Sequence, residues 1–89
     1  MTLAQAKATV RALGLRLHWN VALGEYEVYL PGQRGHAYFT NDRADAVGTA
    51  QQWRALIEKR YPNLSPDEAA AAVVRNAAGA PSTRLSFLA

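Results

Sequence analysis

The chain has 89 residues and no cysteine, and its ten basic and seven acidic side chains give a formal net charge of +3 at pH 7. A chain of this length makes one small domain. The lack of cysteine excludes disulfides and thiolate metal sites, and no stretch approaches the ~20 apolar residues of a membrane span. We therefore predict a cytoplasmic protein that has no membrane attachment, metal site or cofactor.

A helix is the first predicted element, over residues 3–13. Thr2 and Gln5 have the spacing of a capping box, and Gly14 is suited to end the helix. Apolar residues recur at helical spacing between them, at Leu3, Ala6, Val10 and Leu13.

Three strands are predicted next. Residues 15–21 and 25–30 both alternate between apolar and polar side chains, and the short turn around Gly24 predicts an antiparallel hairpin. After the loop at residues 31–35, residues 36–40 form the third strand. We expect Ala37 and Phe39 to face the core in this strand, with His36 and Tyr38 on the opposite face.

Two helices complete the pattern. The first covers residues 42–61, because Thr40, Asn41 and Asp42 are good N-caps and Pro62 ends the periodic stretch. The second covers residues 66–78, which begin after a second capping box, Ser65 to Glu68. Residues 80–89 have no periodicity, so residues 1–79 are predicted to form the domain and residues 80–89 a mobile tail.

These elements predict an α+β fold with the order α-β-β-β-α-α. A three-stranded antiparallel sheet would carry helices one and two on one face. Because alanine buries little surface, the core should depend on a few large residues, namely Leu13, Leu15, Leu17, Trp19, Val28, Leu30, Phe39, Trp53, Leu56 and Ile57.

Enzyme chemistry has little support in the sequence. The two histidines, His18 and His36, are both placed at outward strand positions, where Glu25 or Glu27 would give a small His/Glu site. The alternative is that they are ordinary surface residues of an open sheet face. With no metal-ligand spacing and no nucleophile motif, we predict a protein that is not an enzyme and has no catalytic residues.

Nucleic-acid binding is the first functional hypothesis. An open sheet face that carries cations and aromatic rings suits single-stranded nucleic acid, with arginines on phosphates and tyrosines stacked on bases. Two glutamates on the same face oppose this, and the basic residues are scattered along the chain. The alternative is that the tyrosines pair across strands or lie under the third helix. The candidate site residues are Arg16, His18, Tyr29, Arg34, His36 and Tyr38.

Protein–protein interaction is the second hypothesis. Helix 66–78 is rich in alanine, and small side chains allow close helix packing, either onto the chain's own sheet or onto another subunit. A free sheet edge offers a second route to a homodimer. The partner is thus nucleic acid or another protein.

Two resemblances accompany this pattern. The segments Leu13-Gly14-Leu15, Gly24-Glu25-Tyr26-Glu27-Val28 and Ala37-Tyr38-Phe39-Thr40-Asn41-Asp42, followed by Asp45-Ala46-Val47, resemble small uncharacterised proteins of bacterial phages, prophages and plasmids. This resemblance covers about residues 1–55 and implies an accessory protein from a mobile element.

The helix–strand–strand–strand–helix order is also similar to the double-stranded-RNA-binding fold. That family contacts phosphates with a lysine-rich start of its last helix. The corresponding segment here is Asn41-Asp42-Arg43-Ala44-Asp45, in which two carboxylates stand at positions where the family carries cations.

Overall fold

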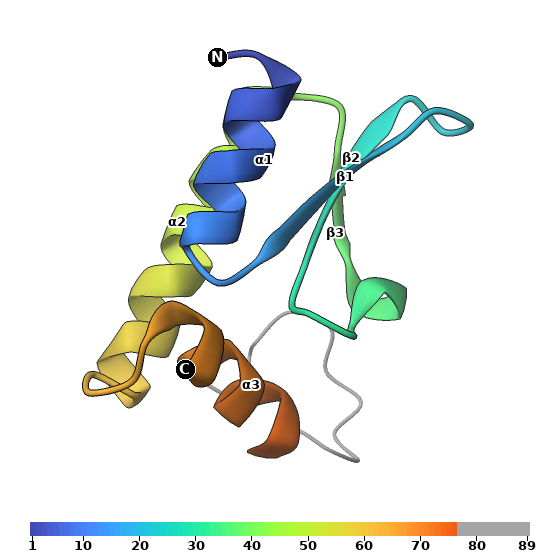
Figure 1. The fold of residues 1–89 in the computed structure, drawn as a ribbon. Helices are drawn as coiled ribbons and strands as arrows, with labels where there is room; N and C mark the ends of the chain where they lie inside the picture. Colours follow the sequence, from blue (N-terminus) through green and yellow to red (C-terminus); the bar gives the residue numbers. More distant parts are fainter. Residues whose placement is uncertain (77–89) are drawn as a thin grey trace.

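The computed structural model describes residues 1–76 and has the predicted α+β architecture (Figure 1). Its elements, in chain order, are α1 (Leu3–Ala12), β1 (Arg16–Asn20), β2 (Glu25–Tyr29), the short 3-10 helix η1 (Arg34–His36), β3 (Tyr38–Thr40), α2 (Arg43–Arg60) and α3 (Pro66–Asn76). The order α-β-β-β-α-α is therefore confirmed. The predicted end of the last helix at residues 77–78 and the predicted tail at 80–89 lie outside the described residues.

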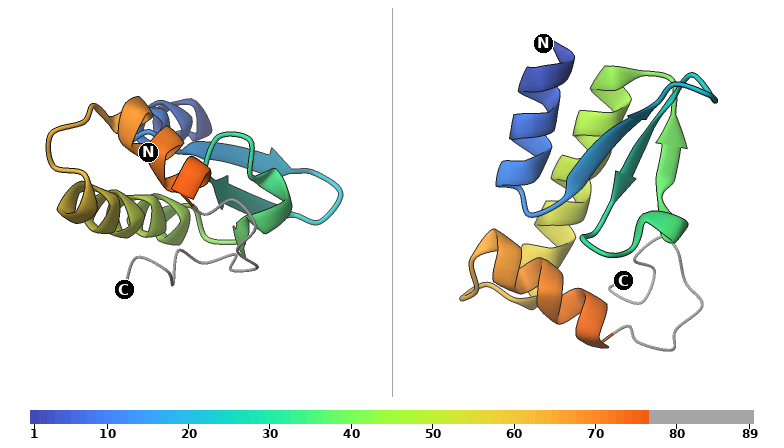
Figure 2. Two further views of the ribbon diagram at one scale, coloured as in Figure 1. Left: turned by 90° about the horizontal axis from the view of Figure 1, so that it is seen from below. Right: turned by 45° about the vertical axis from the view of Figure 1, so that its right-hand side comes forward.

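The sheet is antiparallel throughout and has the strand order β1-β2-β3. Residues 21–24 make the turn between β1 and β2, which sets Asn20 opposite Glu25 and Arg16 opposite Tyr29. Helices α1 and α2 pack side by side on one face of the sheet, as predicted (Figures 1 and 2). We call the opposite face the outward face. It carries Arg16, His18, Asn20, Glu25, Glu27, Tyr29 and Phe39.

The helix starts are fixed by the side chains that the sequence indicated. Thr2 and Gln5 make both hydrogen bonds of a capping box, at 3.1 and 2.8 Å. Asp42 caps α2 by accepting hydrogen bonds from the backbone N–H groups of Ala44 and Asp45. These bonds satisfy N–H groups that have no partner inside the helix, so each helix begins at a defined residue.

The core lies between the sheet and the helices and contains more small residues than expected. Leu15, Val28 and Ile57 are its largest fully buried side chains together with Val10 and Val73. The remaining buried positions include six alanines, namely Ala6, Ala46, Ala50, Ala69, Ala70 and Ala72. Two predicted core residues are instead exposed, because Phe39 points to the outward face and Leu56 lies toward the solvent side of α2.

Helix α3 packs on α2 and lies across one end of the sheet (Figures 1 and 2). Asn76 donates a hydrogen bond to the Tyr61 hydroxyl just after α2, which ties the two helix ends together. Gly14, between α1 and β1, meets the start of α3: it has φ +88°, and an added Cβ would lie 2.5 Å from the Pro66 carbonyl oxygen. Only glycine combines this backbone angle with so close an approach.

The third strand differs from the prediction by one residue in register. It is shorter than residues 36–40, because His36 belongs to η1. Tyr38 pairs with Val28 and Phe39 with Glu27, so Tyr38 is on the helix side and Phe39 on the outward face. A shift of one residue exchanges the two faces of a strand. The inward place suits Tyr38 because its ring packs on the core while its hydroxyl donates to Asp45 Oδ2 at 2.7 Å.

Candidate functional site

A basic groove runs along the free edge of β1. Lys7 and Arg11 of α1 form one side, and Arg16 and His18 of β1 form the other, with Tyr29 of β2 beside them. Its volume is about 360 Å³, and Ala8 and Leu17 complete its lining. None of these lining residues is acidic. Three of the ten basic side chains of the sequence, Lys7, Arg11 and Arg16, meet in this groove.

Local structure explains why these cations meet. Lys7 and Arg11 are four residues apart, which places them on the same exposed side of α1. Gly14 reverses the chain so that β1 returns alongside that helix (Figure 1). The Arg16 guanidinium is held near the strand, since its Nη1 donates to the Leu15 carbonyl oxygen at 2.8 Å.

On the outward face next to the groove, Glu27 is the centre of a polar network. Its side chain is only 4% exposed. Arg34 Nε donates to Glu27 Oε1 at 2.8 Å, and Asn20 Nδ2 donates to Glu27 Oε2 at 2.7 Å. Both carboxylate oxygens therefore have a donor, as a buried carboxylate requires.

The network also sets the charge on this face. The hydrogen bond from Arg34 is the main cause that lowers the pKa of Glu27 below its usual value, and it outweighs burial, which acts in the opposite direction. The same contact raises the pKa of Arg34. Glu27 is thus ionised and paired at neutral pH, so its charge is offset locally, in contrast to the free repulsive carboxylate that the sequence suggested.

The six predicted site residues fall into three groups. Arg16, His18 and Tyr29 come together in the basic groove. Arg34 lies in η1 and reaches the outward face through Glu27. His36 and Tyr38 do not belong to the predicted outward strand face, since His36 is an exposed η1 residue and Tyr38 faces the helices.

Sequence reasoning missed three contributors. Lys7 and Arg11 lie within the predicted helix over residues 3–13, but only the chain reversal at Gly14 brings them to β1. Phe39 was assigned to the core because it is apolar, yet its side chain is on the outward face and the residue is 46% exposed. An exposed phenylalanine on the same sheet face as Arg16 and Tyr29 is a more specific signal than any one of the six predicted site residues.

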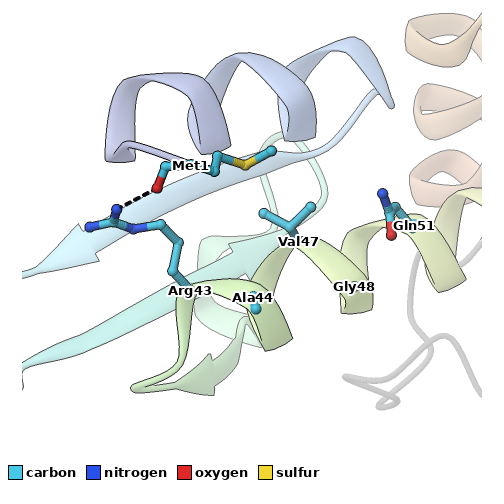
Figure 3. A pocket seen from close by; sticks show the side chains of 6 residues that line it. All are labelled: Met1, Arg43, Ala44, Val47, Gly48 and Gln51. Carbon is cyan, nitrogen blue, oxygen red and sulfur yellow. Dashed lines mark hydrogen bonds between the residues drawn. The ribbon is translucent and has the colours of Figure 1, made fainter.

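A second, mostly apolar hollow of about 430 Å³ lies between the N-terminus and the first turns of α2 (Figure 3). Met1, Val47 and Gly48 contribute apolar surface there. Arg43 is already engaged, because its Nη1 donates to the Met1 carbonyl oxygen at 2.7 Å and its Nε to the Tyr26 hydroxyl at 2.9 Å. This hollow brings no acid–base pair together and adds no candidate chemistry.

Two further findings concern the described residues 1–76. No group of three or more histidine or acidic side chains in this part of the chain is arranged to hold a metal ion. No helix in the same range is long and apolar enough to cross a membrane.

Comparisons of the chain with protein-family models, with curated proteins and with solved structures each gave no match. The functional argument therefore depends on the groove and the outward face alone.

Proposed function

We propose that this protein is a non-enzymatic nucleic-acid-binding module that contacts the phosphate backbone through the basic groove. The observation that carries the proposal is the convergence of Lys7, Arg11 and Arg16 with His18 and Tyr29 in one groove, where none of the described lining residues is a carboxylate. Cations gathered in a groove beside an aromatic ring are the usual features of a nucleic-acid site. We further propose a bacterial cytoplasmic protein of phage or mobile-element origin, which the sequence resemblance favours.

The arginines and Lys7 would contact phosphates. Each neutralised phosphate releases counterions, so binding must weaken steeply as salt rises. Arg11 and Lys7 are both exposed on α1, and neither side chain makes a hydrogen bond or ion pair with another of the described residues 1–76. Their replacement by alanine keeps a good helix former at each position, which makes them suitable probes of the groove.

The test is a fluorescence-anisotropy titration of the parent and of the Lys7→Ala/Arg11→Ala variant with labelled oligonucleotides, between about 50 and 200 mM salt. If both side chains contact phosphates of a single strand, the salt slope of the variant falls by about 1.4, since each contributes about 0.7. The Lys59→Ala/Arg60→Ala variant removes the same charge from the exposed end of α2, outside the groove, and should bind like the parent.

Two results would contradict the proposal. A parent protein that binds no oligonucleotide at low salt excludes the function. Equal weakening of the two charge variants would mean that net charge, and not the groove, determines binding.

Protein–protein interaction is the second candidate, and one observation favours it. Val21 and Leu23 at the tip of the β1–β2 hairpin are 80% and 61% exposed, and the tip projects away from the helices (Figure 1). In the described part of helix 66–78, by contrast, Ala69, Ala70 and Val73 are buried within the chain. A homodimer through the hairpin or a sheet edge predicts a mass that rises with concentration in sedimentation, and the Val21→Ser/Leu23→Ser variant should then be monomeric.

A further inference from the structure

Two aromatic rings share the outward face of neighbouring strands. Phe39 lies opposite Glu27, and Tyr29 is two residues beyond Glu27 on the same strand, so the two rings occupy diagonal positions of one face. Such diagonal neighbours are about 7–8 Å apart. Tyr29 is half-buried and lines the basic groove, whereas Phe39 is 46% exposed and lies farther across the sheet, on β3.

From this arrangement we infer that the ligand is a single-stranded nucleic acid that leaves the groove and crosses the sheet, with bases stacked on Tyr29 and Phe39. The inference rests on the proposed function and adds the form of the ligand and its path. Bases stack on aromatic side chains only when they are free of a duplex, whereas a duplex offers phosphates alone to an open sheet.

Charges are present at both ends of this path. Arg16 and His18 stand on β1 beside Tyr29, at the groove. At the other end, Arg34 is 55% exposed and is attached to Glu27, the residue opposite Phe39. The attachment uses Nε, which leaves the outer end of the guanidinium to donate to a phosphate.

Glu27 is therefore a positioning residue for Arg34. Its carboxylate is held by Asn20 on the other side, which fixes the direction in which the guanidinium extends. A fixed guanidinium loses less freedom on binding than a mobile one.

The outward face is accessible among the described residues. All three helices lie on the helix side or across one end of the sheet, and none lies on the outward face (Figures 1 and 2). The question left open by the sequence, whether helix 66–78 covers this face, is answered for residues 66–76: they pack on α2 instead.

The test compares a single-stranded DNA of about 12 nucleotides with the duplex of the same sequence and with an abasic strand of equal length and charge. The parent should bind the single strand at least tenfold more tightly than either of the other probes. Phe39→Ala and Tyr29→Ala should each lower affinity for the single strand about tenfold, with an unchanged salt slope and unchanged affinity for the abasic strand.

The matched control is Tyr38→Phe, which alters an aromatic residue on the other face of the same strand. It should bind all probes like the parent. For Glu27, a double-mutant cycle applies: Glu27→Gln should weaken binding in the parent and have no further effect in an Arg34→Ala background, which a purely structural role would not produce.

Failure of the inference and failure of the proposed function are distinguishable. If single strand, duplex and abasic strand bind equally and Phe39→Ala has no effect, while Lys7→Ala/Arg11→Ala still weakens binding, the single-strand path is wrong and the basic groove stands. If the parent binds no probe at low salt, both are wrong.

Discussion

The two faces of the sheet differ in which side chains they bury and in how their polar groups are hydrogen-bonded. On the helix side, Leu17 and Val28 are buried with alanines from α1 and α2, and Tyr38 adds a ring whose hydroxyl reaches Asp45. On the outward face, a buried carboxylate is held between an amide and a guanidinium, and an apolar ring is left exposed. The first arrangement stabilises the fold. The second uses a buried carboxylate to hold Arg34 and leaves both Arg34 and Phe39 exposed, which is what a binding surface needs.

The largest expected effect is a loss of fold stability caused by a substitution on the helix side of the sheet. Val28 is fully buried, so Val28→Ala removes two methyl groups from the helix side and leaves a cavity, at a cost of about 2–3 kcal/mol. For a domain of this size the melting temperature should fall by about 10 °C or more. Thermal denaturation measures the loss. At a temperature where the variant is folded, its affinity for an oligonucleotide should be unchanged. A parallel loss of affinity would contradict the division between a stabilising helix side and a binding outward face.

Glu27 contributes both to the stability of the fold and to the proposed binding surface, because it is buried and also belongs to the outward face. Its folded pKa lies below the usual value, so the folded state holds the carboxylate charged more strongly than the unfolded state does. The resulting stability is present above the unfolded pKa near 4.5 and is lost as pH falls through the folded pKa. Denaturant unfolding between about pH 6 and pH 3 should show this loss in the parent.

The Glu27→Gln variant is the control for that measurement. It should be less stable than the parent at pH 6, because Arg34 loses its charged partner. The difference should shrink toward acid pH. A difference that is independent of pH would mean that the ion pair contributes nothing to folding.

The smallest expected effects are on the free energy of unfolding, and they come from substitutions at Tyr38 and Phe39, the adjacent aromatic residues of β3. Tyr38→Phe removes the hydrogen bond to Asp45 Oδ2 and should cost about 1 kcal/mol. Phe39→Ser, on the outward face, should change the free energy of unfolding by less than that, because 46% of Phe39 is already exposed. Urea denaturation of both variants checks the pair. If Phe39→Ser were the more destabilising, the ring of Phe39 would have a structural role and not a binding one.

The sequence predicts the elements well where several signals agree. Helix α1 has a capping box, a periodic apolar stripe and a terminating glycine, and its observed bounds differ from the prediction by one residue at its end. The clear alternation through Leu17 and Val28 likewise fixes the faces of β1 and β2. At β3 the signal is weak, because two aromatic residues are adjacent and either one suits a core position.

The candidate site is harder to predict than the fold for a physical reason. Lys7 and Arg16 are nine residues apart in sequence and on different elements, and only the positive φ of Gly14 brings them to one groove. The register of β3 depends on how many residues η1 uses, and on a hydrogen bond from Tyr38 to a helix that comes later in the chain. Neither is contained in a local pattern.

Helix α3 has a consequence for how this molecule opens. Its buried contacts come mainly from Ala69, Ala70, Ala72 and Val73, so each of its residues removes little apolar area from water. Elements held by small areas open at lower free energy than the rest of a domain. Amide protons of α3 should therefore exchange with solvent before those of β2, and the Pro66 contact at Gly14 should separate while the sheet and its basic groove remain intact.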